Sequence, residues 1–250
     1  MILSYPQAKS IVICGDIHGD FETLVYKITM QYQMSDTLVI VAGDCGFGFA
    51  KRNYYERIFN KIQKRLSSHN NWIAMVRGNH DNPLYFNGEE KINHKRWRTI
   101  PDYSIIQACN HNILCVGGAI SIDRYWRKQE MTINNRELYW IDEPPYFNET
   151  KLNELKLENI NIDTVISHTA PSFCELQTKL GLITWANYDK QLLNDCDQER
   201  KTMDLILKKL KSNNHKITNW YYAHFHQSWQ SHINKTKFVM LDIMELQELK

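Results

Sequence analysis

Six short apolar runs, rich in β-branched and aromatic residues, recur along this 250-residue chain, and several stop at a glycine or a histidine. Their length and composition are typical of buried strands. The runs are Ile11–Cys14, Leu38–Ala42, Trp72–Val76, Ile113–Val116, Thr164–Ser167 and Trp220–Ala223. Apolar residues at helical spacing predict helices over Phe21–Gln33, Asn53–Leu66 and Asp189–Leu210. Strands that alternate with helices indicate an α/β fold.

The chain has the composition of a folded protein rather than of a disordered one. Hydrophobic residues make up 43% and charged residues 23%, and the length is sufficient for a sizeable core. No internal repeat, low-complexity segment or Gly/Ser linker marks a boundary, so we predict one domain over residues 1–250. The polar and basic stretch Lys91–Arg98 is predicted to be an exposed loop.

Charge, hydropathy and cysteine usage narrow the choice of compartment and partner. A net charge of +2 does not indicate nucleic acid as the partner. No stretch approaches eighteen apolar residues, so we expect no membrane span, and the N-terminus lacks the pattern of a secretory signal. The six cysteines form no CxxC pair, and we predict reduced thiols in a cytoplasmic protein. A mature secreted form stays an alternative, and the oligomeric state stays open.

Five of the apolar runs are followed at once by side chains that bind metals. In α/β sheets, ligands bind beyond the carboxyl ends of the strands. The sequences found there are GDIHG from Gly15, GD from Gly43, RGNHD from Arg77, a single histidine at 168, and HFH from His224. The strand ends therefore deliver seven candidate ligands: Asp16, His18, Asp44, Asn79, His168, His224 and His226.

The chemistry of this set indicates two metal ions. Carboxylate, imidazole and amide oxygen together suit divalent Mn, Fe or Zn. Seven ligands are too many for one tetrahedral ion, but they suit two adjacent ions bridged by one carboxylate, here Asp44. Two ions roughly 3.5–4 Å apart are a recurring device for hydrolysing phosphate esters. We therefore expect two divalent ions as cofactors, with Mn²⁺ favoured and Fe or Zn²⁺ as alternatives.

The motif order GDIHG, GD, GNHD, H and HFH resembles the calcineurin-like metallophosphoesterase superfamily, with matches from Asp16 to His226. The resemblance implies a four-layer αββα sandwich, in which two mixed β-sheets lie face to face and helices flank them. It also implies a dinuclear centre. One ion would take Asp16, His18, Asp44 and His226, and the other Asp44, Asn79, His168 and His224. His80 would be the non-ligand histidine beside the leaving group, and Asp81 would orient it.

Two departures from the family pattern concern the last and the second motif. Ala223 stands where the family usually has glycine in its GHxH motif, and we expect metal binding to survive. The protein Ser/Thr phosphatase branch carries an Asp-Arg pair shortly after the aspartate equivalent to Asp44, and no such pair occurs here. The substrate therefore stays open.

Three arginines are candidates for binding the phosphate of a substrate. Arg124 and Arg127 follow the strand Ile113–Val116 and a Gly-Gly pair, and a guanidinium matches phosphate oxygens in a bidentate manner. Arg77 directly precedes the third motif. The alternatives are a capping loop whose arginines pair with carboxylates and, for Arg77, a role in packing.

The other histidines and the helix caps offer simpler interpretations. Asp16 and His18 alone would be compatible with capping a helix that begins near Asp20. The histidines outside the motifs are predicted to be surface residues: His69, His94, His111, His215 and His232.

The expected activity is metal-dependent hydrolysis of a phosphate ester, with a phosphomonoesterase favoured. A phosphodiesterase or nuclease is the alternative, and a non-catalytic metal-binding scaffold is disfavoured because no expected ligand is missing. Hydroxide would attack the phosphorus directly, and His80 would protonate the leaving alkoxide as general acid.

Overall fold

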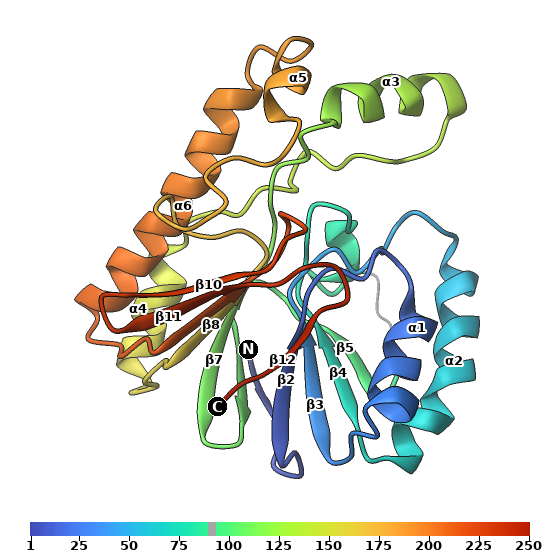
Figure 1. Ribbon diagram of the computed structural model, residues 1–250, viewed down its shortest axis with the longest axis vertical. Helices are drawn as coiled ribbons and strands as arrows, with labels where there is room; N and C mark the ends of the chain where they lie inside the picture. Colours follow the sequence, from blue (N-terminus) through green and yellow to red (C-terminus); the bar gives the residue numbers. More distant parts are fainter. Residues whose placement is uncertain (90–93) are drawn as a thin grey trace.

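The computed structural model describes residues 1–89 and 94–250, and the strands of these residues form two mixed sheets (Figure 1). The five-stranded sheet has the order β12-β2-β3-β4-β5. Strands β2 to β5 are mutually parallel, and β12 runs antiparallel to β2. The bounds are β2 (Ser10–Cys14), β3 (Thr37–Val41), β4 (Trp72–Met75), β5 (Trp97–Thr99) and β12 (Leu246–Glu248).

The seven-stranded sheet has the order β1-β6-β7-β8-β9-β11-β10. Strands β7, β8, β9 and β11 run parallel in its centre, and β10 and β6 are antiparallel to their neighbours β11 and β7. The bounds are β1 (Ile2–Ser4), β6 (Ser104–Ala108), β7 (His111–Val116), β8 (Thr164–Ser167), β9 (Asn219–Tyr222), β10 (Trp229–Ile233) and β11 (Thr236–Met240).

Alternation along the strands explains why the two sheets pack face to face. Ile11 and Ile13 of β2 point into the core shared by both sheets, whereas Val12 and Cys14 point to the helices on the other side. Successive side chains of a strand point to opposite faces, so a wholly apolar strand is buried on both. The shared core also receives Ile113 and Ile166 from the seven-stranded sheet.

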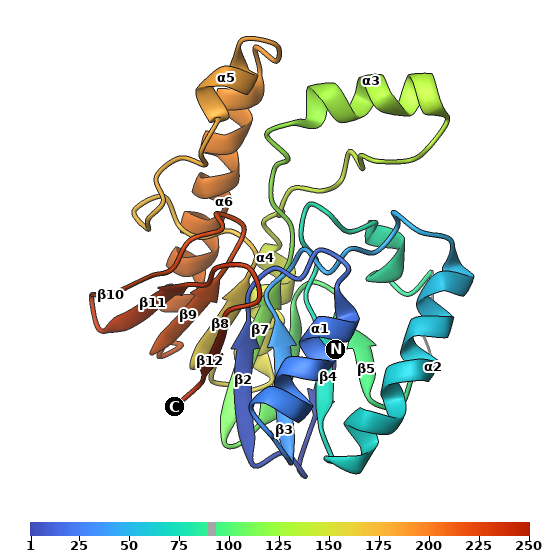
Figure 2. The same cartoon turned by 45° about the vertical axis from the view of Figure 1, so that its right-hand side comes forward.

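Helices cover the outer face of each sheet and complete a four-layer sandwich (Figures 1 and 2). On the five-stranded sheet lie α1 (Phe21–Tyr26), its π-helical continuation Lys27–Gln31, and α2 (Arg52–Ser68). On the seven-stranded sheet lie α4 (Glu149–Leu157) and α6 (Leu192–Ser212). The remaining helical segments are α3 (Arg124–Asn134), α5 (Leu182–Ala186) and the 3₁₀ turn Pro83–Tyr85.

The predicted fold class is confirmed, and each predicted run and helix corresponds to an observed element. The six runs are β2, β3, β4, β7, β8 and β9, and the three helices are α1 with its continuation, α2 and α6, with ends shifted by a few residues. The single domain stays a prediction. Among the described residues, no helix has both the length and the apolarity that a membrane crossing requires. All six cysteines are free, and the cytoplasmic location stays a prediction.

Two local predictions are wrong. The stretch Lys91–Arg98 is not simply an exposed loop: residues 91–93 lie outside the described residues, and Trp97, which begins β5, is fully buried. Its indole stacks on Phe59, so one aromatic residue among basic neighbours outweighs their polarity. His215, predicted on the surface, is only 7% exposed and accepts a hydrogen bond from the Ile162 amide at 3.3 Å.

A long excursion of the chain, residues 122–147, carries α3 and lies beyond the carboxyl ends of β2 to β4 (Figure 2). We call this segment the α3 arm. Its first helical residue, Arg124, is tied by carboxylates to the segment before α6 and to α6 itself, at Asp189 and Asp195. At its other end, Arg136 donates to the Phe49 carbonyl at 2.6 Å. The arm therefore faces the strand ends where the candidate ligands lie.

Candidate metal centre

The structure brings all seven candidate ligands to one place between the two sheets. Asp16 and His18 follow β2, Asp44 follows β3 and Asn79 follows β4. From the other sheet, His168 follows β8, and His224 and His226 follow β9. Asp20, rather than Asp16 or His18, caps α1, since its side chain accepts the Thr23 amide hydrogen at 3.1 Å.

One group of donor atoms is formed by Asp16, His18, Asp44 and His226, whose ligand atoms lie within 4.8 Å of one another. His18 Nε2 and His226 Nε2 are 3.2 Å apart, and His226 Nε2 is 2.9 Å from Asp16 Oδ2. Both carboxylates are buried, with Asp16 1% and Asp44 0% exposed, whereas the two imidazoles reach the surface. The group is therefore open on the side of the histidines.

A second group contains Asp44, His168 and His224, within the same 4.8 Å, and shares Asp44 with the first. His168 Nε2 lies 3.1 Å from Asp44 Oδ1 and 3.1 Å from Asn79 Oδ1. The other ring nitrogen, Nδ1, is 2.8 Å from the Ala42 carbonyl and donates to it. That bond fixes the ring and directs Nε2 toward Asp44 and Asn79, as metal-ligating histidines require.

The donor set fits divalent cations. The buried Oδ2 atom of Asp44 has no hydrogen-bond partner among the described residues, and Oδ2 of Asp16 has only the nearby imidazole of His226, although a buried unpaired carboxylate oxygen is costly. Burial opposes a charge on His168, but Asp44 and Asp16 outweigh it and raise the pKa of His168 to about 9. The cluster thus draws positive charge to the point where the donor atoms converge, and divalent ions supply that charge.

Two glycines explain how the ligands approach so closely. Gly43 has a φ of +102°, and a Cβ there would lie 2.2 Å from Nδ1 of His168. A Cβ at Gly78 would lie 2.1 Å from Asp44 Oδ1. A side chain at either position would displace a ligand. The glycines of the GD and GNHD motifs are therefore required because no larger residue fits there.

Comparison with known proteins agrees with this geometry. The sequence matches the family model described as calcineurin-like phosphoesterase over residues 9–228, which is most of the chain. The chain belongs to the calcineurin-like phosphoesterase family. It is a hydrolase acting on phosphate esters, and the family implies divalent metals at a site such as this one.

Two solved structures share the fold of this calcineurin-like phosphoesterase at low sequence identity. The protein TT1561 of Thermus thermophilus is 14% identical, with a TM-score of 0.53 over 97% of this chain and 99% of that one. A dimetal phosphatase from Danio rerio is 12% identical, with a TM-score of 0.51 over 96% of this chain and 88% of that one. At such identities the likeness shows the fold alone.

Asp81 contacts backbone groups in this phosphoesterase site, and its role in orienting His80 stays a prediction. Its two oxygens accept the backbone N–H groups of Cys45, Gly46, Phe47 and Gly78 at 2.8–2.9 Å. Burial and the neighbouring Asp44 raise the pKa of Asp81 to about 7, and the hydrogen bonds from Phe47, Gly78 and Cys45 oppose this rise. Asp81 therefore holds the loop that carries Asp44, because its oxygens accept the backbone N–H groups of that loop.

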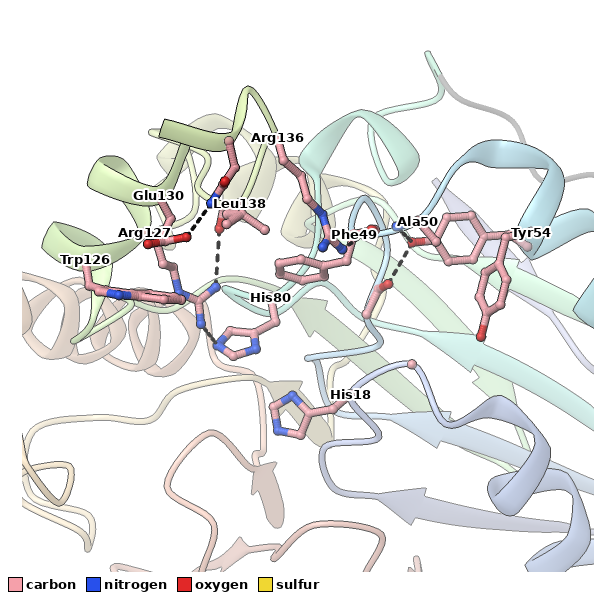
Figure 3. A pocket seen from close by; sticks show the side chains of 14 residues that line it. His18, Phe49, Ala50, Tyr54, His80, Trp126, Arg127, Glu130, Arg136 and Leu138 are labelled. Carbon is pink, nitrogen blue, oxygen red and sulfur yellow. Dashed lines mark hydrogen bonds between the residues drawn. The ribbon is translucent and has the colours of Figure 1, made fainter. Parts of the chain in front are cut away.

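His80 lies at the rim, beside the first group of ligands. Its ring is 5.0 Å from the His18 ring, between centroids, and its Nε2 accepts a hydrogen bond from Arg127 (Figure 3). Burial lowers the pKa of His80 to about 4, with Asp44 opposing and Arg127 adding to the effect. The imidazole is therefore neutral in this arrangement, with the Arg127 guanidinium directly against it.

The three candidate arginines differ in their contacts. Arg77 donates to Asp102 at 3.0 Å and to the carbonyl of Glu143 at 2.8 Å, so its guanidinium is held within the protein. Arg124 donates to two carboxylates of the α5–α6 region at 2.6 Å each, as in the capping-loop alternative. Both guanidinium groups are occupied by protein. Arg127 also pairs with a carboxylate, that of Asp123 at 2.8 Å, but of the three it alone contacts His80.

The sequence analysis did not predict the series of hydrogen bonds that supports Asn79. Asn79 Nδ2 donates to Ser121 Oγ at 2.9 Å, and Ser121 donates to Glu143 at 2.7 Å. This series turns the amide so that its oxygen faces His168. Lys179 was missed as well, and its Nζ lies 3.4 Å from Nδ1 of His224. No local motif marks these residues, since they reach the site only through long loops.

Proposed function

We propose that this chain is a phosphomonoesterase whose site holds two divalent ions, with Mn²⁺ favoured, and that Asp44 bridges them. The observation that carries the proposal is the pair of donor groups that share Asp44 and leave a buried oxygen of Asp44 without a hydrogen-bond partner. One ion would take Asp16, His18, Asp44 and His226. The other would take Asp44, Asn79, His168 and His224.

When bound, such ions would supply Lewis acidity that activates water and offsets the charge of the phosphoryl oxygens. The chain's own contribution is to orient the ligands before the substrate arrives. Ala42 fixes the His168 ring, and Ser121 fixes the Asn79 amide. The loop that carries Asp44 is held by Asp81, so the ligands need little rearrangement when the ions bind.

His80 is the proposed general acid, and Arg127 is the proposed substrate-binding residue. The guanidinium of Arg127 meets Nε2 of His80 at the open side of the ligand cluster. A phosphate dianion there would attract the guanidinium and would raise the pKa of His80, because nearby negative charge favours imidazolium. Binding of the substrate would thus put a proton on the ring that must deliver one to the leaving alkoxide.

Metal analysis combined with two chromogenic substrates tests the proposal. The purified chain should hold close to two divalent ions, lose activity with a chelator and regain it with Mn²⁺. Nitrophenyl phosphate should be hydrolysed faster than bis-nitrophenyl phosphate. A binding stoichiometry of one ion, or a clear preference for the diester, would contradict the dinuclear phosphomonoesterase and favour the alternative.

A further inference from the structure

A cavity of about 690 Å³ opens directly beside the metal centre, between the α3 arm and the loop that follows β3. His18 and His80 lie at its edge nearest the ligands, and four aromatic side chains line it: Phe49, Tyr54, Tyr55 and Trp126 (Figure 3). None of the four is a candidate ligand. A volume of this size accommodates a whole small organic molecule rather than a phosphate alone.

One wall of the cavity is fixed before any ligand binds. The Tyr55 hydroxyl donates to the Gly46 carbonyl at 2.9 Å and accepts the amide hydrogens of Gly48 and Ala50 at 2.8 and 3.1 Å. Between the latter two residues stands Phe49, whose ring centroid is 5.9 Å from that of His80. An aromatic surface held rigidly beside the general acid costs little entropy to occupy.

The opposite wall presents a tryptophan that the protein itself leaves uncovered. Trp126 of α3 is 49% exposed and faces the cavity, next to Arg127, which contacts His80 (Figure 3). Its neighbour Tyr125 is also on α3 but is stacked on Tyr188, with ring planes 27° apart. Both side chains are about half exposed, Tyr125 at 42%, but only Tyr125 stacks on another ring among the described residues, so the Trp126 ring is available to a ligand.

The polar groups of the same cavity suit an alcohol with hydrogen-bonding groups of its own. Glu130 and Asn134 line it one helical turn apart, and Asn134 donates to Glu130 at 2.6 Å. A phosphate held by the metal centre and Arg127 would point its leaving group into this space. Aromatic walls would then contact a flat ring, and the carboxylate and amide would contact hydroxyl or amino groups.

We infer that the cavity is a leaving-group subsite, and that the substrate is a small phosphate monoester whose alcohol carries a flat aromatic ring. The ring can come from two sources: an aryl phosphate, or a nucleoside monophosphate in which a sugar separates ring and phosphate. The inference rests on the proposed phosphomonoesterase and names the class of its substrate. Trp126 and Phe49 are the residues that would recognise the ring.

Adenosine 5′-monophosphate and ribose 5-phosphate form the decisive pair of substrates, because both leave the same primary alcohol and differ in the base. For the Mn²⁺-loaded chain we expect a higher kcat/KM with the nucleotide, by roughly fivefold to a hundredfold, which is the usual effect of stacking one base. Trp126→Ala should remove that preference and leave ribose 5-phosphate nearly unchanged. Trp126→Phe, which keeps a ring, should retain most of it.

Phenyl phosphate, compared between the wild type and each variant, tests the other source. Because the same substrate is used with both enzymes, the intrinsic reactivity of its leaving group does not affect the ratio of their kcat/KM values. A Trp126→Ala loss confined to phenyl phosphate would assign the subsite to aryl phosphates, and a loss confined to the nucleotide would assign it to nucleotides. Tyr125→Ala is the matched control on the same helix and should change neither.

Three outcomes overturn the inference: equal kcat/KM for the nucleotide and the sugar phosphate with no effect on phenyl phosphate, an equal loss with every ester in Trp126→Ala, or the same loss in Tyr125→Ala. Hydrolysis of all esters without regard to a ring would leave the proposed function intact and remove the subsite alone. Absence of phosphate release from every ester, at any metal content, would instead reject the proposed function.

Discussion

The metal centre and the α3 arm lie face to face, but they are built in different ways. The ligands of the metal centre follow five strands that the two sheets hydrogen-bond in register, and Asp44 and His168 are completely buried. The α3 arm leaves both sheets and is attached chiefly through side chains, among them those of Arg124, Arg136 and Glu143. Ile133 on its helix is 74% exposed.

This difference suggests that the metal centre determines the reaction and the α3 arm determines the choice of substrate. A backbone fixed by two sheets sets distances between ligands that no single loop can change, which suits chemistry that tolerates little displacement. Apart from Glu143, which supports Asn79 through Ser121, an arm attached mainly by side chains can vary in composition without disturbing the ligands. We therefore expect changes in the metal centre to abolish activity, and changes in the arm to alter which ester is used.

Asp44→Asn should have the largest effect. The amide removes the negative charge that screens two cations from each other, and one pair of unit charges at 4 Å is worth about 4 kcal/mol at an effective dielectric constant of 20, or roughly a thousandfold in affinity. At least one ion should be lost, and activity should fall with it. Metal analysis by mass spectrometry measures this, with His18→Ala expected to weaken chiefly one ion. Two ions bound at wild-type affinity would show that Asp44 does not bridge.

His80→Ala should have the next largest effect, because His80 belongs to the metal centre and also contacts the arm through Arg127. The loss of a general acid lowers kcat by about two to four orders of magnitude. Both ions should remain bound, and the loss should be smaller with nitrophenyl phosphate, whose leaving group needs no proton. An equal loss for nitrophenolate and alkoxide leaving groups would argue against acid catalysis, and loss of metal would make His80 a ligand.

The same contrast explains how far the sequence could be interpreted. Each ligand directly follows an apolar run, so local pattern was enough to predict the strands and to place Asp16, Asp44 and His168 at neighbouring strand ends. Burial on both faces makes these strands uniformly apolar, and that signal is local. The four-layer fold followed from the motifs that the runs carry.

What the sequence did not reveal depends on contacts between distant segments. The sequence around Arg124 suggested a loop, whereas the structure has a helix there. Carboxylates 65 and 71 residues away stabilise the start of this helix. Asp81 lies next to His80 in sequence, yet its oxygens accept backbone N–H groups from the loop that carries Asp44. Two of these donors, Cys45 and Phe47, precede Asp81 by 36 and 34 residues. Glu143 supports Asn79 through Ser121 and belongs to no motif. Such partners become visible only in three dimensions.

Arg124→Ala should loosen the arm and leave the metal centre intact. The guanidinium is mostly buried, and its two bonds to Asp189 and Asp195 are each 2.6 Å long. A hydrogen bond to a charged group contributes about 1.5–3 kcal/mol, so we expect faster proteolysis of residues 122–147 and a KM raised by roughly tenfold. The metal content should stay at the wild-type value, and Lys61→Ala, which removes an exposed ion pair with Glu22, should change neither property. A fall in metal content would mean that the contacts of Arg124 also support the ligands.

His215→Gln should have the smallest effect and should leave both the metal centre and the arm unchanged. His215 lies before the amino end of β9, whereas the ligands follow the carboxyl end of this strand. It is 7% exposed, and its Nε2 has no hydrogen-bond partner among the described residues. Burial holds the pKa of His215 below its ordinary value of about 6.5, so the unfolded chain takes up a proton first as the pH falls. The neutral ring therefore contributes stability above about pH 6.5, and this contribution decreases as the pH falls toward the folded-state pKa.

Urea unfolding at pH 7.5 and pH 5.5 should show a smaller difference in unfolding free energy for His215→Gln than for the wild type, and exposed His232→Gln should match the wild type. Equal pH dependence in all three would show that the buried imidazole does not titrate on unfolding.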